Sequence, residues 1–131
     1  MINPDNKTKT VQEFNLNNYK KLIENNPCHI ATINDDNTPN LAVASDIKNL
    51  NNKIILISNN EMIHTPDNII RNNNVVMTSF NGKWAGLRIT GIINYQTKGQ
   101  FFDKCNNLFN NDTATPKGAI IIEVTKVESI A

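Results

Sequence analysis

Short apolar segments separated by turn-forming residues recur along this chain, and their spacing constrains the fold more than any other feature. The six segments that are typical of strands are 28–34, 39–47, 53–58, 75–80, 84–96 and 119–127. The first three follow one another closely enough to form consecutive antiparallel hairpins. Closing such a sheet into a small barrel removes its exposed edges. The pattern therefore predicts a mainly β fold, a six-stranded antiparallel barrel, rather than a sheet wound from βαβ units.

Three helices are expected at connections between these segments. Apolar residues recur at helical spacing over 16–25 and 98–110, and a shorter helix is predicted over 65–72. Thr65 stands directly before Pro66, and proline suits the first position of a helix. Thr65 is therefore expected to be the N-cap, with its side chain accepting a hydrogen bond from a first-turn amide.

The third strand carries the argument for self-association. Its four consecutive apolar residues, Ile54 to Ile57, indicate a strand that is covered on both faces. In a small barrel the second apolar face of such a strand has to be buried against another element or subunit, and two-fold self-association is the commonest way to bury it. The sequence therefore predicts a homodimer.

Composition excludes several classes of function. The 13 Lys and Arg residues are scattered and nearly balanced by 12 Asp and Glu, so the basic surface that nucleic acids require is absent. Cys28 and Cys105 have neither CxxC spacing nor a companion cluster of histidines, so neither a zinc site nor a disulfide framework is expected. A length of 131 residues predicts a single domain over 1–131, of which the polar stretch 1–13 is expected to be loosely ordered.

The expected cellular location is the cytoplasm. No apolar run approaches the ~18 residues that a membrane-spanning helix needs. The N-terminus also lacks the charged-then-apolar pattern of a secretory signal.

The segment between the third and fourth strands has the features of an anion site. The third strand ends in Ser58, Asn59 and Asn60, and His64 then precedes the helix that starts near Thr65. A helix N-terminus offers free N–H groups and a partial positive charge, which suit a phosphate. An ordinary loop followed by a capped helix is the alternative, since most helix caps bind nothing.

Four pieces of sequence, taken in order, resemble a known family. They are His29–Ile33 with Pro39–Val43, the stretch 62–72 with 75–78, Leu87–Gly91, and a helix followed by Glu123–Thr125. Together they resemble the FMN-binding split-barrel family, which includes pyridoxamine 5′-phosphate oxidase. The likeness covers roughly residues 15 to 128 and is greatest to the short bacterial FMN-binding and flavin-reductase-like members.

The resemblance implies a split-barrel homodimer with one FMN in each of two clefts at the interface. It also implies an FMN-dependent oxidoreductase or electron-transfer protein, with NAD(P)H or a redox protein as the electron donor. The positions that it assigns to the cofactor are Ser45, Ser58, Asn59, Asn60, His64 and Thr65, and Trp84 and Arg88 are further candidates for contact with the flavin. For Arg88 a structural ion pair with an acidic residue such as Asp46 or Glu123 is favoured over the flavin contact, and for Trp84 the alternative is a place at the barrel mouth.

His64 departs from the family, whose short FMN-binding members carry lysine before the helix threonine. Lysine is charged at any ordinary pH, whereas histidine side chains titrate near ~6.5. A phosphate held by His64 is therefore expected to bind more weakly, with an affinity that depends on pH. An exposed loop histidine without a ligand is the alternative.

Three functions remain open at this stage. An electron-transfer flavoprotein needs no general acid or base from the chain, which fits a sequence without an evident catalytic constellation. Oxidation of pyridoxamine phosphate is disfavoured, because few Arg and Lys are available for a second phosphorylated ligand and the end at Ser129–Ala131 lacks an Arg-containing tail. The third is a non-catalytic ligand-binding split barrel whose flavin binding is weakened or lost.

Overall fold

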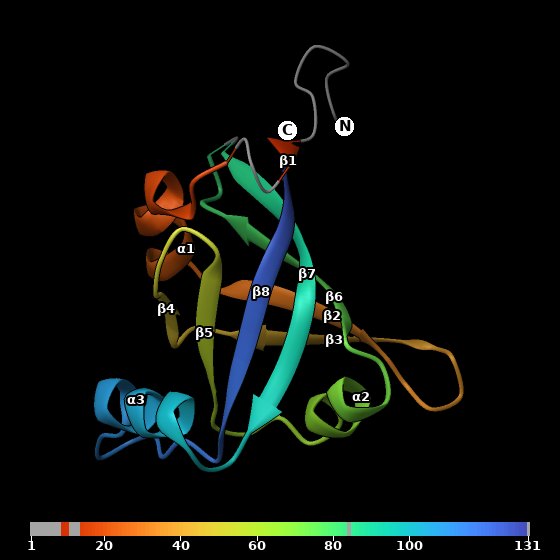
Figure 1. Cartoon of the computed structure of the whole chain (residues 1–131), viewed down its shortest axis with the longest axis vertical. Helices are drawn as coiled ribbons and strands as arrows, with labels where there is room; N and C mark the ends of the chain where they lie inside the picture. Colours follow the sequence, from red (N-terminus) through yellow and green to blue (C-terminus); the bar gives the residue numbers. More distant parts are fainter. Residues whose placement is uncertain (1–8, 11–13, 84, 131) are drawn as a thin grey trace.

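The fold is a single antiparallel sheet that curls into a half-barrel with a few short helices (Figure 1). This computed structural model describes residues 9–10, 14–83 and 85–130. The strands are β1 (Lys9–Thr10), β2 (Cys28–Ile33), β3 (Pro39–Ala44), β4 (Ile47–Asn49), β5 (Ile54–Asn59), β6 (Asn74–Phe80), β7 (Gly86–Gln96) and β8 (Gly118–Ser129). The helices are the 3₁₀ turn η1 (Leu16–Tyr19), α1 (Lys20–Asn25), α2 (Thr65–Arg71) and α3 (Gln100–Phe109).

The strand order confirms the predicted barrel and corrects the number of its strands. Neighbouring strands run in the order β3-β2-β6-β7-β8-β5-β4, and β1 pairs with β8. All six predicted strands are present, but β1 and β4 add two short ones. Lys9 and Thr10 therefore belong to the sheet, although 1–13 was expected to be loosely ordered; the rest of that stretch lies outside the described residues.

The expected strand 39–47 is in fact two strands, and the break between them closes the barrel. β3 lies at one end of the strand order and β4 at the other, so the chain crosses between them at Ser45 and Asp46. The crossing is fixed where the Ser58 N–H donates to the Asp46 carbonyl oxygen over 3.0 Å. In Figure 1, β2 and β3 pass behind β5, β8 and β7, so the sheet encloses an interior.

The start of α2 differs from the prediction by one residue. The Asn68 N–H donates to the His64 carbonyl oxygen over 3.1 Å, so His64 holds the N-cap position and makes no side-chain cap bond. Thr65 is the first helical residue and is buried, and its hydroxyl accepts from the Asn40 side-chain amide over 3.2 Å. The predicted Thr65 cap is therefore wrong, because this hydroxyl bonds to the neighbouring hairpin instead of to the helix backbone.

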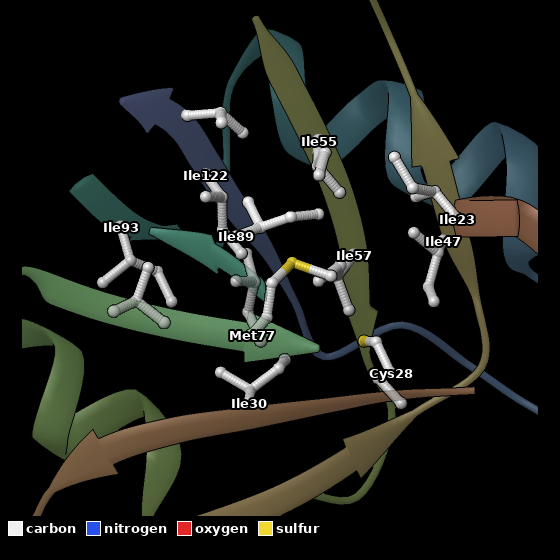
Figure 2. Close-up of a cluster of buried hydrophobic side chains, with 14 of the residues drawn as sticks. Ile23, Cys28, Ile30, Ile47, Ile55, Ile57, Met77, Ile89, Ile93 and Ile122 are labelled. Atoms are coloured by element: carbon white, nitrogen blue, oxygen red, sulfur yellow. The ribbon is translucent and has the colours of Figure 1, made fainter. Parts of the chain in front are cut away.

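The barrel interior is packed with branched aliphatic side chains from both walls. Figure 2 shows Met77 surrounded by Ile30, Ile57 and Ile89, all of which are fully buried. These residues alternate with outward-facing ones along their strands, as the pleat requires. No helix in the described part of the chain is long and apolar enough to cross a membrane.

A second, smaller cluster covers the outer face of β5. Leu56 on β5 packs there with Ala119 and Ile121 of β8 and with Cys105 of α3, and three α3 phenylalanines lie against them. The prediction that both faces of this strand are covered is confirmed. The cover, however, is α3 of the same chain, so the apolar run Ile54 to Ile57 is no argument for a partner subunit.

Candidate functional site

A pocket of about 540 Å³ opens at the crossing from β3 to β4. Its walls come from residues 42–46, from the end of β5 and the turn after it, and from the segment that leads into β8. Three of the residues predicted from sequence, Ser45, Ser58 and Asn60, line this pocket together. They are brought together because β5 lies next to β4, directly beyond the crossing.

A short hydrogen-bond chain fixes the polar wall of the pocket. The buried Ser58 hydroxyl donates to Asn60 Oδ1 over 2.6 Å, and Asn60 Nδ2 donates to Asp46 Oδ2 over 2.9 Å. Both ends of the Asn60 amide are thus used, which sets its orientation and holds the Asp46 carboxylate in place. This wall is preorganised, because each of its polar groups has a defined partner.

Cys105 lies beside this wall, and its thiol is unreactive. Burial raises the pKa of the Cys105 thiol, an effect that the hydrogen bond with Ser58 opposes and the negative charge of Asp46 reinforces. Burial likewise raises the pKa of Cys28, to about 11. Both thiols are therefore protonated near neutral pH, and neither supplies a thiolate nucleophile.

Asn59 builds the turn rather than facing the pocket. Its side chain accepts from the Met62 N–H over 2.7 Å and donates to the Tyr95 hydroxyl over 2.9 Å. Its carbonyl oxygen accepts from the Lys117 N–H over 2.8 Å, which ties two walls of the pocket together. Asn59 is buried and acts on the site through the shape of this turn.

His64 lines a different pocket, of about 270 Å³, next to α2. Asp35, Asp36 and Asp67 share that pocket with His64 and Arg71. Its floor is a polar network in which Asn68 Nδ2 donates to Thr32 Oγ1 over 3.1 Å and to Asn34 Oδ1 over 2.9 Å. The structure thus separates His64 from the pocket that holds Ser45, Ser58 and Asn60.

Arg88 forms the ion pair that was the alternative to flavin contact, but with a partner that was not expected. Its guanidinium donates to both carboxylate oxygens of Glu128, over 3.1 and 3.0 Å, and this hydrogen bonding raises the pKa of Arg88. The expected partners were Asp46 and Glu123. A register shift at Thr90 and Gly91 moves β8 along β7 and brings Glu128 opposite Arg88. Trp84, the other predicted ring contact, lies outside the described residues.

Lys117, Glu61, Thr113 and Thr115 line the first pocket and were not found from sequence. Three of them come from the irregular segment before β8, which carries no periodic pattern. Lys117 is the only Lys or Arg among the described lining residues, which also include the carboxylates Asp46 and Glu61. Within the described parts of the chain, no group of His, Cys, Asp and Glu side chains is arranged to hold a metal ion.

The pocket offers hydroxyl, amide and ammonium donors together with two carboxylates. Such a set can hydrogen-bond a polyol chain and the polar edge of a heterocycle, and Lys117 can neutralise one anionic group. The set lacks the arrangement of nucleophile, base and orienting group that covalent catalysis requires. Its chemistry is therefore that of binding and orienting a ligand.

Comparison with known proteins places this chain among relatives. No protein-family model matches it. It is 31% identical over 115 residues to the uncharacterised protein MJ0282 of Methanocaldococcus jannaschii, covering 84% of this chain and 76% of that protein.

Three solved structures share the fold. HupZ of Group A Streptococcus superposes with a TM-score of 0.81 at 22% identity, over 87% of this chain and 92% of that one. An FMN-binding protein from Syntrophomonas wolfei gives 0.77 at 17% identity, over 88% and 86% of the two chains. A pyridoxinephosphate oxidase family protein from Clostridium acetobutylicum gives 0.60 at 17% identity, over 83% and 82%.

Proposed function

This chain belongs to the FMN-binding split-barrel family, whose fold it shares with solved FMN-binding and pyridoxinephosphate oxidase family proteins. From that premise we propose that it is an electron-transferring flavoprotein. In this proposal it binds FMN as a homodimer, with the flavin at the interface. NADH, NADPH or a redox protein reduces the flavin, and an unidentified acceptor reoxidises it.

The observation that carries this proposal is the pocket at the β3–β4 crossing. Ser45, Ser58 and Asn60, which the family resemblance assigns to the cofactor, line it together. Its volume of about 540 Å³ falls within the range of roughly 300–1,000 Å³ that is usual for cofactor sites.

The residues of the pocket fit a flavin nucleotide in chemical character. The hydroxyls of Ser45, Thr113 and Thr115 suit the ribityl chain, and the Asn60–Asp46 pair suits the polar edge of the ring. Lys117 is the cation available for the phosphate on this wall. Because Asp46 and Glu61 repel a phosphate, we expect the phosphate to lie toward Lys117 and away from these carboxylates.

These pocket residues indicate which roles belong to the protein and which to a bound flavin. A bound flavin supplies the electron transfer itself, and the protein supplies binding, orientation and electrostatics. Asn60 and Asp46 fix the ligand through the hydrogen-bond chain, Lys117 neutralises it, and the apolar wall at Ala42 and Ala44 keeps water from one side.

A ligand-binding protein without turnover is the second candidate. The two carboxylates beside a single lysine favour it, since they weaken the hold on any phosphorylated ligand. A protein that binds FMN but is reduced by neither NADH nor NADPH, nor by a redox-protein donor, belongs to this second class.

The choice between Lys117 and His64 as the phosphate partner tests the site. We expect Lys117→Ala to weaken FMN binding about ten- to hundredfold, the value of a charge-assisted hydrogen bond. His64→Ala should leave the affinity unchanged, as should the control Lys104→Ala on the exposed surface of α3. The measurement is a fluorescence titration with FMN at several values between about pH 6 and 9.

The pH profile separates the two partners independently of the variants. Lysine stays charged over this range, and the phosphate of FMN loses its second proton near ~6, so the affinity of the unchanged protein should be flat between about pH 7 and 9. An affinity that falls as the pH rises, and that loses this dependence in His64→Ala, would assign the phosphate to His64 instead. No binding of FMN by the unchanged protein at any pH would overturn the proposed function.

A further inference from the structure

Three strand ends meet beside the pocket at the β3–β4 crossing. β5 ends at Asn59, β8 begins at Gly118, and the end of β7 pairs with β8 close to that start (Figure 1). Asn59 and Gly118 are themselves register partners. The three residues that follow Asn59 line the pocket, and so does Lys117, which directly precedes Gly118. A group that fixes these strand ends therefore fixes two walls of the pocket.

Tyr95 of β7 lies over this junction, although it is not among the described residues that line the pocket. A Cβ built at Gly118 would overlap the Tyr95 ring and hydroxyl, so glycine at this position lets the phenol lie directly against the β8 backbone. The ring also packs against the interior cluster, which fixes its place. Tyr95 thus contacts β8 one residue after Lys117.

The Tyr95 hydroxyl also holds the end of β5, through Asn59. Asn59 Nδ2 donates to this hydroxyl over 2.9 Å, and Asn59 Oδ1 accepts from the Met62 N–H over 2.7 Å. The Asn59 carbonyl oxygen accepts from the Lys117 N–H over 2.8 Å. Asn59 is buried, so water competes little for these bonds. The Tyr95 hydroxyl, the turn after β5 and the Lys117 backbone therefore belong to one hydrogen-bond network.

The hydroxyl is the partner that sets the orientation of the Asn59 amide. The other acceptor within reach of Asn59 Nδ2 is the Met62 carbonyl oxygen at 3.4 Å, which is near the outer limit for a hydrogen bond. Without the hydroxyl a buried donor loses its good partner, which favours a shift of Asn59 away from its position. Because Asn59 bonds both Met62 and Lys117, such a shift moves both pocket walls.

Resting on the proposed function, we propose that Tyr95 is a positioning residue that holds Lys117 where it meets the phosphate of FMN, so that the pocket selects a phosphorylated flavin over an unphosphorylated one. Lys117 is the only Lys or Arg among the described lining residues, and its long side chain is flexible. Such a side chain binds better from a fixed backbone, because less conformational freedom is lost on binding. Tyr95 fixes that backbone without touching the ligand.

Fluorescence titration with FMN and with riboflavin, which lacks only the phosphate, tests the selection. We expect Tyr95→Phe to weaken FMN binding about three- to tenfold, the value of one hydrogen bond, and to leave riboflavin binding unchanged. In the Lys117→Ala background, Tyr95→Phe should cause no further loss of FMN affinity, because the two residues act as one unit. The matched control is Tyr19→Phe, at the other tyrosine of the chain, which packs against the same interior cluster and should change neither affinity.

Amide hydrogen exchange of the flavin-free proteins measures the positioning itself and needs no ligand. We expect the Met62 and Lys117 amides to exchange about tenfold faster in Tyr95→Phe than in the unchanged protein. Amides of the β2–β6 pairing, which report on the whole fold, should change less. This difference separates a local loosening of the pocket walls from a general loss of stability.

Three results would overturn the proposal: unchanged exchange at Lys117, equal losses of FMN and riboflavin affinity, or the same loss of FMN affinity in the Lys117→Ala background. Failure of the proposed function has a different signature. If the unchanged protein binds neither flavin, the proposed function and the flavin selection are both wrong. Faster exchange at Met62 and Lys117 in Tyr95→Phe would still assign the positioning of these two walls to Tyr95.

Discussion

The barrel has two walls, one formed by β5 and β8 and the other by β3, β2 and β6, and their outer faces differ in what covers them. On β5 and β8 the outer face is closed by α3, whose phenylalanines pack over Leu56 and Ile121. On β3, β2 and β6 the outer face is open, and Leu41 and Val43 project from it. Both walls contribute the same kind of aliphatic side chain to the interior, so the difference lies only in what covers the outside.

This difference shows why a hydrophobic run is a poor guide to a subunit interface. The run Ile54 to Ile57 is the most apolar strand segment of the chain, and it is satisfied within the chain. The open wall carries apolar residues on both faces of β3, where Leu41 and Val43 are exposed and Ala42 and Ala44 are partly or fully buried. The uncovered apolar surface therefore comes from outward positions of a shorter apolar stretch, and the length of an apolar run does not locate it.

The largest expected effect comes from replacing a leucine by alanine on each wall and comparing the two losses in the free energy of unfolding. Leu56→Ala should lower the free energy of unfolding by about 2–5 kcal/mol, because Leu56 is fully buried under α3. Leu41→Ala should change it by less than about 0.5 kcal/mol at concentrations where the chain is monomeric. Urea unfolding measures both. Equal costs would mean that the two walls are covered alike.

The sequence predicts most of the strands and helices but misses where some of them begin and end. Period-2 and apolar segments locate the six main strands, because each is long enough to show its pattern. The split of 39–47 is missed, since the break consists of Ser45 and Asp46 alone, which is too short to stand out between two apolar stretches. The start of α2 is missed by one residue, because the Thr65 hydroxyl accepts a hydrogen bond from Asn40, which is distant in sequence.

A medium effect is expected at the border of the open wall. Arg88→Met removes the bidentate partner of Glu128, whose side chain is only 8% exposed, and should cost about 1–3 kcal/mol. The control is Lys126→Met, since this lysine lies 3.8 Å from Glu128 and is half-exposed, so its loss should cost less than about 1 kcal/mol. Thermal unfolding ranks the two variants. A larger loss in Lys126→Met would show that Arg88 does not hold this edge.

The smallest effect concerns Glu24, where α1 packs on β4. Burial acts to raise the pKa of Glu24, but the Asn49 N–H at 2.8 Å, together with Lys20 and Lys48, outweighs burial and holds the pKa below its ordinary value. A lowered pKa in the folded state stabilises the fold above the ordinary value of 4.5, and this contribution disappears as the pH falls through the folded value. Glu24→Gln should therefore cost about 1 kcal/mol at pH 7 and almost nothing near pH 2.

Urea unfolding of this variant and of the unchanged protein across that pH range gives the comparison. A stability difference between the two proteins that does not shrink in acid would show that the charge of Glu24 does not support the α1–β4 contact.

The site is predicted from the sequence less completely than the fold. The sequence selects Ser45, Ser58 and Asn60 because they lie near the ends of recognisable strands and match a family pattern, and the three line one pocket. Lys117 and the threonines before it are missed, since they reach the pocket from an irregular segment more than fifty residues further along the chain. His64 was assigned to the site because it precedes a helix, but in the structure it lines a neighbouring pocket.

Visible absorption of the purified protein, recorded after FMN is added and the excess is removed, tests the central claim most directly. The claim is that the pocket at the β3–β4 crossing holds a flavin. We expect a flavin spectrum at about one FMN per chain, which Lys117→Ala diminishes. A colourless protein that refuses FMN would contradict the claim and leave a split barrel without flavin chemistry.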